Sequence, residues 1–210
     1  MQFTDVIEQR YSVRKYKDQP IPEEDIRAII TAAGKAPSGK NNQNWHFVVI
    51  QNKEMLEAMA KAVEGKMEKI AGGLPQEKGE KFLKFSRFST FFRNAPVVVA
   101  VYGNVYVPEG LAEVEASGMP EEDGQRMWYA NPGVQSIGAG VENLILKAVD
   151  MGYGACWMTS ANHSLKEMEE VIGFEKEGYH LMALVPMGVA EGERKSPAKH
   201  PVDEIMTIIR

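Results

Sequence analysis

The sequence has almost no cysteine, no long apolar run and no excess of positive charge, and each absence excludes a class of protein. Its 210 residues contain one cysteine, Cys156, which excludes an intrachain disulfide framework and an all-cysteine metal site. The net charge of -5 gives no general attraction to nucleic acid or to anionic membranes. The most apolar stretch, residues 133–158, is interrupted by charged side chains, so we expect no membrane span. The polar amino-terminal residues contain no secretory signal, and we therefore expect a cytoplasmic protein.

The sequence also lacks the short motifs that mark several classes of enzyme. It contains no Gly-x-Ser-x-Gly elbow, no P-loop and no glycine fingerprint of a dinucleotide-binding fold. We assign no metal site, because the four histidines show no spacing typical of metal ligands: His46, His163, His180 and His200. Cys156 lies in an apolar run with no basic neighbour indicated, which predicts a buried, unreactive thiol. We assign no catalytic acid, base or nucleophile.

Length and hydrophobic periodicity predict one α+β domain that spans residues 1–210. Helical spacing predicts helices at residues 3–9 with Thr4 as N-cap, 22–33, 53–70, 77–92, 133–149, and 164–172 with a capping box of Ser164 and Glu167. Apolar runs rich in β-formers predict strands at residues 46–51, 96–102, 155–158 and 180–189. The tail, residues 201–210, fits either a strand or a helix.

Two adjoining segments stand out from this regular pattern. The helix expected over residues 133–149 is apolar on nearly all sides, so it must be buried in a large core or between subunits. Residues 103–132 before it are rich in glycine, proline and acids and include the aromatics Tyr106, Trp128 and Tyr129. An irregular stretch of this length is often a lid or a binding loop. A solvated excursion that contains a short helix is the alternative.

Two arginines and a hydroxyl lie close together near the start of the chain. Arg10, Ser12 and Arg14 alternate along a segment that follows the first expected helix. If the segment is extended, alternate side chains point to one side and the three groups converge. Guanidinium groups bind phosphate through strong, bidentate hydrogen bonds. The pattern fits a phosphate site, and an arginine-rich helix end stabilised by the helix dipole is the alternative.

A second polar cluster lies about one helix further along, just before an expected strand. Pro37, Ser38 and Gly39 open a loop, and Asn41 and Gln43 are among the amide side chains at its exit. Amides both donate and accept hydrogen bonds, which suits the imide edge of a planar heterocycle. A turn stabilised by Asx hydrogen bonds is the alternative. Together the two clusters favour a phosphorylated cofactor that carries a ring.

Several motifs follow one another in a specific order along the whole chain. A helix leads into Arg10-Tyr11-Ser12-Val13-Arg14, and a second helix leads through Ala36-Pro37-Ser38 and Trp45 into a strand. The later motifs are Arg93-Asn94-Ala95-Pro96, the long apolar helix, Gly152-Tyr153-Gly154-Ala155-Cys156-Trp157-Met158, and Lys199-His200-Pro201-Val202-Asp203-Glu204. Each motif alone is loose, but the ordered set resembles the nitroreductase family of flavoproteins.

The resemblance implies a nitroreductase-like fold, a central and mostly antiparallel sheet flanked by helices, in an intertwined homodimer with FMN at the subunit interface. It assigns the phosphate and ribityl chain to Arg10, Ser12 and Arg14, and Tyr11 stands where a second basic residue is common. It assigns further cofactor contacts to Pro37, Ser38, Gly39, Asn41 and Gln43 of the other subunit, to Trp157, Met158 and Thr159 against the flavin ring, and to Lys199 near the phosphate. Backbone N–H groups near Met158 and Thr159 are expected to face flavin N5. Asn44 replaces a proline that is frequent before the tryptophan.

The resemblance also implies an FMN-dependent oxidoreductase that uses NAD(P)H to reduce nitroaromatics, quinones or related acceptors. Donor and acceptor would occupy one pocket in turn, which predicts ping-pong kinetics, and residues 103–132 would cap that pocket. The expected partners are a second copy of the chain and a small aromatic or quinone acceptor, with no nucleic acid and no membrane.

Three alternatives stay open beside this function. Thr159 lies near the position where the halotyrosine-dehalogenating branch of the family carries a hydroxyl, and the ending at residues 201–206 is similar to that branch, which favours a reductive dehalogenase. A flavin storage or redox-sensing protein would have the same FMN clusters with a blocked ring face. An α+β dimer without any cofactor would use neither cluster.

Overall fold

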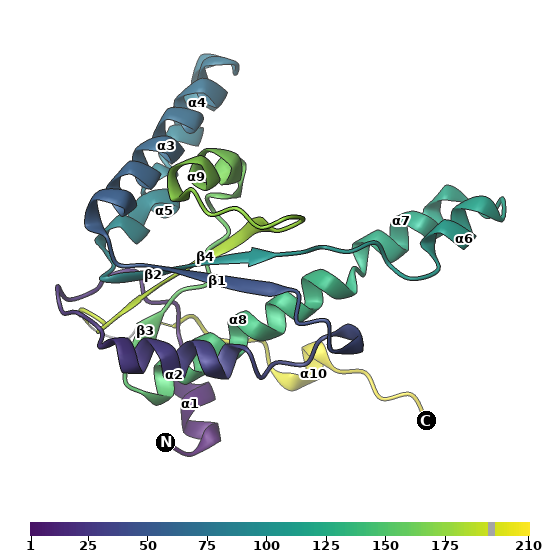
Figure 1. The fold of residues 1–210 in the computed structure, drawn as a ribbon, viewed down its shortest axis with the longest axis horizontal. Coiled ribbons are helices and arrows are strands. Elements are labelled where there is room, and N and C mark those ends of the chain that lie inside the picture. Colours follow the sequence, from purple (N-terminus) through teal and green to yellow (C-terminus); the bar gives the residue numbers. More distant parts are fainter. Residues whose placement is uncertain (193–195) are drawn as a thin grey trace.

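A four-stranded antiparallel sheet forms the centre of this computed structural model, which describes residues 1–192 and 196–210 (Figure 1). The strands are β1 (Trp45–Ile50), β2 (Val97–Gly103), β3 (Gly154–Ala155) and β4 (His180–Gly188). Their order is β1-β2-β4-β3, and every neighbouring pair is antiparallel. Every residue of β2 is buried, because this apolar strand is paired on both edges and covered on both faces. The expected α+β class with a mostly antiparallel sheet is confirmed.

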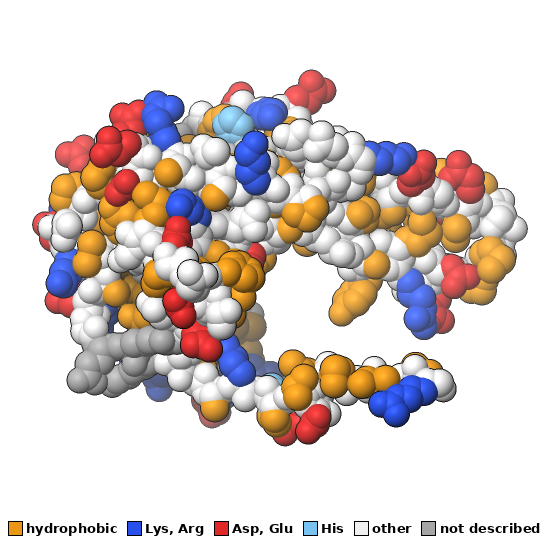
Figure 2. All heavy atoms as spheres, turned by 90° about the horizontal axis from the view of Figure 1, so that it is seen from below, with side chains coloured by type: hydrophobic (Ala, Val, Ile, Leu, Met, Phe, Trp, Pro, Cys, Tyr) orange, Lys and Arg blue, Asp and Glu red, His pale blue; other side chains and the backbone are white. Residues whose placement is uncertain are grey.

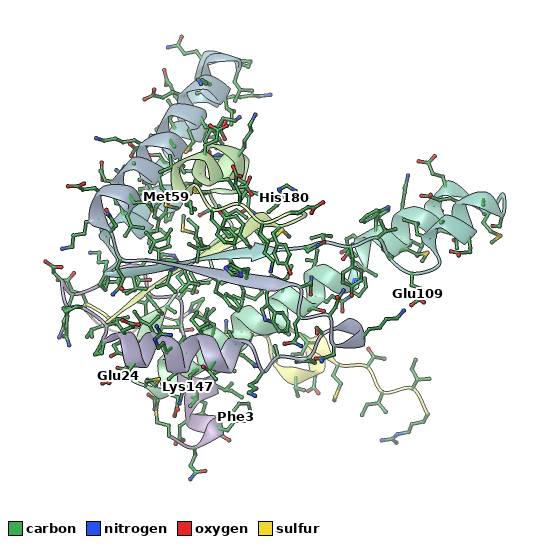
Figure 3. The ribbon with its side chains drawn as sticks, viewed as in Figure 1. Phe3, Glu24, Met59, Glu109, Lys147 and His180 are labelled. Atoms are coloured by element: carbon green, nitrogen blue, oxygen red, sulfur yellow. The ribbon has the colours of Figure 1, made fainter. Side chains whose placement is uncertain are left out.

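Helices form a layer on each face of the sheet (Figure 1). They are α1 (Phe3–Gln9), α2 (Glu23–Ala33), α3 (Lys53–Gly72), α4 (Gln76–Leu83), α5 (Ser86–Thr90), α6 (Leu111–Ala116), α7 (Glu121–Tyr129), α8 (Pro132–Asp150), α9 (Leu165–Ile172) and α10 (Val202–Ile205), with short 3-10 helices η1 (Gly39–Asn41), η2 (Phe91–Asn94) and η3 (Asn162–Ser164). Ala100 and Tyr102 of β2 share one core with α3 and α9, and Met59 of α3 points toward the sheet (Figure 3). Val99 and Val101 face the other way, into a core shared with α2 and α8, as the two-residue period of a strand requires.

The long apolar helix expected over residues 133–149 is present as α8. Asn131 caps its N-terminus, because its Oδ1 accepts hydrogen bonds from Gly133 N at 2.8 Å and from Val134 N at 3.2 Å. Pro132 occupies the first turn, where no N–H donor is needed. Val134 is still 46% exposed, so one side of α8 is uncovered in the described chain. Neither α8 nor any other helix in residues 1–192 and 196–210 is long and apolar enough to cross a membrane.

Residues 104–131, which we call the arm, project away from the sheet between β2 and α8 (Figure 1). The arm contains two helices, α6 and α7, where the sequence predicted an irregular stretch with one short helix. These helices pack closely, since a Cβ at Gly124 would lie 3.4 Å from Leu111 Cδ1. Between them the chain turns at Gly118, whose φ of 76° lies in the left-handed region open to glycine.

The prediction of a single helix over residues 77–92 is wrong. The chain forms α4, α5 and η2 instead, with a break at residues 84–85. The hydroxyl of Ser160 donates to Phe88 O at 2.7 Å, and Ser89 Oγ donates to Ser160 O at 2.9 Å. These bonds to a segment far away in the sequence fix the orientation of α5 and bring Phe92 into the core, fully buried.

Other local expectations are also corrected. Gln2, not Thr4, caps α1 through a reciprocal capping box with Asp5. Ser164 precedes α9 as expected, but it makes no cap bond; its Oγ pairs with His163 Nδ1, and Glu167 pairs with Lys66. The predicted strand 155–158 shortens to β3 plus an isolated bridge at Met158. The tail forms the helical turn α10, and its backbone is extended at Met206, but residues 201–210 form no strand.

Gly103→Ala should lower the free energy of unfolding by about 1–3 kcal/mol, because a packed core resists added volume. A Cβ at this position would lie 2.1 Å from Ile137 Cδ1. Gly65→Ala is the matched control: it lies inside α3 with no atom within 4 Å, so it should raise the free energy of unfolding by up to about 1 kcal/mol. Urea denaturation measures whether each substitution lowers or raises the free energy of unfolding. Equal effects of the two substitutions would contradict the packing at the end of β2.

Candidate functional site

The segment that carries the first polar cluster lies extended beside β3. Val13 N donates a hydrogen bond to Ala155 O at 3.0 Å, and Ser12 forms a parallel bridge with Ala155. Val13 is buried against Gly154, where a Cβ would lie only 2.4 Å from Val13 Cγ2. Glycine at position 154 therefore permits the close approach that brings residues 10–14 to the edge of the sheet.

Arg10, Ser12 and Arg14, which we call the arginine cluster, all lie near the thiol of Cys156. Burial raises the pKa of this thiol, while the charge of Arg14, a hydrogen bond with Ser12 and the charge of Arg10 act to lower it. The expected burial of Cys156 is confirmed, with 3% of the residue exposed. The expectation that it has no basic neighbour is wrong, because β3 carries it alongside a segment that is distant in the sequence.

The arginine cluster holds positive charge that no carboxylate of the described chain neutralises. Arg14 Nη1 lies 3.4 Å from Ser12 O, and neither Arg10 nor Arg14 forms an ion pair within the described residues. Other arginines of the chain do pair with glutamates, among them Arg27 and Arg93. Arg14 is exposed and Arg10 is partly exposed, so an anion from solution can reach both. Two accessible guanidinium groups and a hydroxyl are well suited to bind a phosphate.

The segment Trp157–Thr159 follows Cys156 directly and presents an indole and a hydroxyl beside the arginine cluster. Met158 is buried and fixed to β4, since its N–H donates to Leu184 O at 2.9 Å and its carbonyl accepts from Leu184 N at 3.1 Å. Trp157 is 42% exposed, and its ring lies against α8, where a Cβ at Gly138 would be 3.3 Å away. Thr159 is exposed. The Met158 N–H is therefore occupied by the sheet, so the expected approach of a backbone N–H to flavin N5 stays a prediction for Thr159.

The second polar cluster, residues 37–43, forms a tightly bent loop that we call the serine loop. The hydroxyl of Ser38 accepts a hydrogen bond from Gln43 N at 2.9 Å and so closes the loop. Lys40, Asn41 and Gln43 have φ values of 52°, 55° and 45°, in the left-handed region that L-residues disfavour. Asn41 takes part through its backbone, and its side chain is exposed. Backbone strain held in place by specific hydrogen bonds is typical of functional sites.

The serine loop and the arginine cluster lie on different sides of α8 within one chain. Gly39 N donates to Ser136 Oγ at 3.4 Å, so the serine loop touches α8 at residue 136. Trp157 touches α8 at Gly138. Two residues along an α-helix differ in direction by about 200°. The structure therefore brings the arginine cluster together with Trp157–Thr159 and leaves the serine loop apart from them.

The remaining predicted contacts lie at the edges of these clusters. Tyr11 is half-buried and packs against the core on the α3 side of the sheet. Pro37 is exposed at the entry to the serine loop. Lys199 is exposed in the segment before α10 and forms no ion pair within the described residues. Within residues 1–192 and 196–210, no three histidine, cysteine or acidic side chains gather as metal ligands would.

The arm and the tail border an open hollow (Figure 2). In this view they form the two projections on the right, with hydrophobic side chains along the tail. Trp128 and Tyr129 of the arm are 44% and 95% exposed, and Ile208 and Ile209 of the tail are 63% and 93% exposed. Apolar groups exposed at this density on projecting segments are typical of surfaces that contact another molecule.

Three residues that position the site were not found from the sequence. Ser136 holds the serine loop, Tyr106 places its hydroxyl against Gly39, and Asn44 joins the loop to the arm. Ser136 and Tyr106 carried no signal, because their roles depend on the folding of α8 and the arm. Asn44 did carry a signal, because it is a polar residue at a position where proline is frequent in the family that the sequence resembles.

The thiol of Cys156 should react with a disulfide reagent at least about tenfold more slowly in the folded protein than in urea, because the thiolate is the reactive form. Burial both shields the sulfur and raises its pKa. Because Cys156 is the single cysteine, no other thiol of the chain contributes to the labelling signal. Equal labelling rates in the folded and unfolded protein would contradict the placement of Cys156 beneath the arginine cluster.

Comparisons of the sequence and the fold with known proteins point to one family. A sequence model of the Nitroreductase family matches residues 7–189. A solved structure described as a BluB-like flavoprotein from Clostridium difficile 630 is 44% identical, covers 100% of both chains and superposes with a TM-score of 0.93. A relative from Archaeoglobus fulgidus, a putative NADH dehydrogenase/NAD(P)H nitroreductase, is 28% identical over 187 residues, 88% of this chain and 83% of its own.

A third relative shares the fold at lower identity. The structure of oxidised iodotyrosine deiodinase bound to FMN and 3-iodo-L-tyrosine is 20% identical, covers 100% of this chain and 98% of its own, and has a TM-score of 0.68. The family match includes the arginine cluster, the serine loop and Trp157–Thr159. This chain belongs to the nitroreductase family of flavoprotein oxidoreductases.

Proposed function

We propose that the chain binds FMN as a homodimer, takes electrons from NAD(P)H and passes them to a nitroaromatic, a quinone or a related acceptor. Donor and acceptor use the same pocket in turn, so the kinetics are ping-pong. The proposal covers residues 1–210 as one FMN-binding domain, because a single sheet lies between both cores. It also keeps the expected cytoplasmic location.

The observation that carries the proposal is the unneutralised charge of the arginine cluster. Arg10, Ser12 and Arg14 alternate along a segment that pairs with β3 near Cys156, and no carboxylate of the described chain pairs with either arginine. A dianionic phosphate there would be held by charge-assisted hydrogen bonds, the strong class of hydrogen bond in proteins. In a chain of net charge -5, a general attraction to anions does not explain such a local cluster.

The groups around the arginine cluster fit the rest of FMN. The flat ring of Trp157 and the hydroxyl of Thr159 lie next in the chain and suit one face of a planar ring. Asn41 and Gln43 of the serine loop offer amide groups that suit the imide edge of a flavin. FMN, when bound, supplies the hydride and electron chemistry. The chain binds and orients it, and Arg10 and Arg14 hold its phosphate, with Lys199 as a further proposed contact.

The placement of the clusters around α8 supports a site built from two chains. Within one chain the serine loop contacts α8 at Ser136 and Trp157 contacts it at Gly138, on different sides of the helix, which favours a cofactor that spans two chains. In a homodimer the serine loop of one chain would close on the cofactor held by the arginine cluster of its partner. The arm and the tail border the open hollow, and their exposed apolar side chains, Tyr129 of the arm and Ile209 of the tail among them, would provide an apolar surface for that partner.

Reductive dehalogenation of an aromatic substrate is the second candidate function. Thr159 is exposed directly after the fixed residue Met158, so its hydroxyl is free to approach a flavin ring. A hydroxyl at flavin N5 favours one-electron chemistry in the dehalogenating branch that the sequence resembles. Anaerobic incubation of the reduced protein with a halotyrosine separates the two candidates, because only a dehalogenase releases halide.

Purified protein should bind one FMN per chain and turn yellow, and anaerobic NADH or NADPH should bleach the flavin absorbance. Arg10→Ala and Arg14→Ala should each weaken FMN binding about 10–100-fold, since hydrogen bonds between charged groups contribute about 1.5–3 kcal/mol. Arg27→Ala is the matched control, because Arg27 pairs with Glu23 on α2, away from the cluster. A flavin fluorescence titration measures all three affinities.

Each outcome of this experiment separates the candidates. Wild-type protein that binds no FMN would contradict the cofactor assignment. Bound FMN that no nicotinamide bleaches would favour a storage or sensing protein, or a dehalogenase with another donor. Equal loss of affinity in all three arginine variants would place the phosphate somewhere other than the arginine cluster.

A further inference from the structure

Asn44 occupies a buried position between the serine loop and the arm. It follows the last residue of the serine loop and precedes β1, and it is only 3% exposed. The arm leaves the sheet at Asn104 and returns to α8 at Pro132 and Gly133. Asn44 lies beside both of these points, so it is the place where three segments of the fold meet.

The side-chain amide of Asn44 joins the two ends of the arm. Its Nδ2 donates to Asn104 O at 2.7 Å and to Gly133 O at 3.1 Å. The backbone of the same residue adds a third link, since Asn104 N donates to Asn44 O at 3.0 Å. A Cβ at Gly133 would lie 3.3 Å from Asn44 Nδ2, so glycine at this position allows the amide to come close.

The orientation of this amide follows from its neighbours. Both polar groups that it faces on this side are backbone carbonyls, which only accept, so the NH₂ group must point toward them. Its Oδ1 is buried and has no hydrogen-bond partner in the described chain. A buried unpaired acceptor is unfavourable. Asn44 has this unpaired oxygen and also donates two hydrogen bonds. The donated bonds are therefore what Asn44 contributes to the structure.

Two weaker contacts support the same region, one between the serine loop and the arm and one within the arm. Lys40 Nζ pairs with Glu109 Oε2 at 2.6 Å, with Glu109 at the base of the arm (Figure 3). Both side chains are 78% exposed, and exposed pairs of this kind contribute little. Asn131 Nδ2 lies 3.4 Å from Tyr106 O and links the two ends of the arm to each other. The Tyr106 hydroxyl of the arm also lies against Gly39, but Asn44 is the buried residue that joins the two segments by hydrogen bonds.

We propose that Asn44 is a positioning residue that fixes the arm to the serine loop, so that both reach the partner's cofactor as one unit. The arm then forms the wall of the acceptor pocket at the same cofactor that the serine loop closes on. This inference rests on the proposed function for the part that concerns the acceptor. The mechanical link itself rests on the hydrogen bonds alone.

The test compares Asn44→Ala with two other variants of the 210-residue chain, with exchange measured without cofactor and KM measured with FMN bound. Hydrogen–deuterium exchange of peptides from residues 104–131 should become about tenfold faster or more in Asn44→Ala, because Asn104 O and Gly133 O lose the Asn44 donor. The KM for menadione should rise about tenfold, while the dissociation constant of FMN and the exchange of β2 stay unchanged. Asn44→Ser keeps one donor and should give intermediate values. Glu109→Gln, which breaks only the exposed ion pair, should match the wild type.

Several results would overturn the inference. Unchanged exchange in the arm of Asn44→Ala would show that the donated bonds do not hold it, and a uniform increase throughout the protein would show a general loss of stability. A faster arm with an unchanged KM would separate the arm from the acceptor pocket. If Asn44→Ala does not fold, Asn44→Ser must still loosen the arm more than Glu109→Gln. The exchange experiment needs no cofactor, so failure of the wild type to bind FMN would contradict the proposed function and still decide the role of Asn44.

Discussion

The burial of α8 is the constraint on which the rest of the site depends. Its apolar residues pack against α2 and the sheet, and burial of apolar surface at about 25 cal/mol per Å² makes this position costly to change. From this fixed helix, Ser136 holds the serine loop on one side and Gly138 receives Trp157 on the other. If FMN needs both clusters, as proposed, it is shared between two chains, and dimerisation is then a condition for binding it.

Both clusters keep unfavourable features that a bound cofactor would offset in one case and use in the other. Arg10 and Arg14 lie together without a neutralising carboxylate in the described chain, so each raises the electrostatic free energy of the other. The serine loop holds three residues in the left-handed region, at a cost of about 1–3 kcal/mol each. The fold maintains these features through β3 and through the Ser38 hydroxyl. An anionic, planar ligand would offset the repulsion at one cluster and use the fixed shape of the other.

Features that depend on local pattern could be predicted from the sequence, and those that depend on distant contacts could not. The apolar run of β2, the helix α8 and the extended segment 10–14 all follow from the spacing of residues within each segment. The break between α4 and α5 depends on Ser160, about seventy residues away in the chain, as the separation of 71 between Ser89 and Ser160 shows. The arginine neighbours of Cys156 arise in the same way, because the segment that contains Ser12 and Val13 pairs with Ala155. The role of Thr159 and the contact of Lys199 with a cofactor are still predictions.

Heterodimers of Arg10→Ala and Ser38→Ala chains test the two-chain site most directly. Each homodimer carries a defect in both of its sites and should bind FMN weakly. In a mixed dimer with shared sites, one site combines both defects and the other combines the intact arginine cluster of the Ser38→Ala chain with the intact serine loop of its partner. The account predicts that the mixed dimer, purified with two different affinity tags, binds one FMN per two chains with wild-type affinity. A mixed dimer with no site of wild-type affinity would contradict it, because both clusters would then act within one chain.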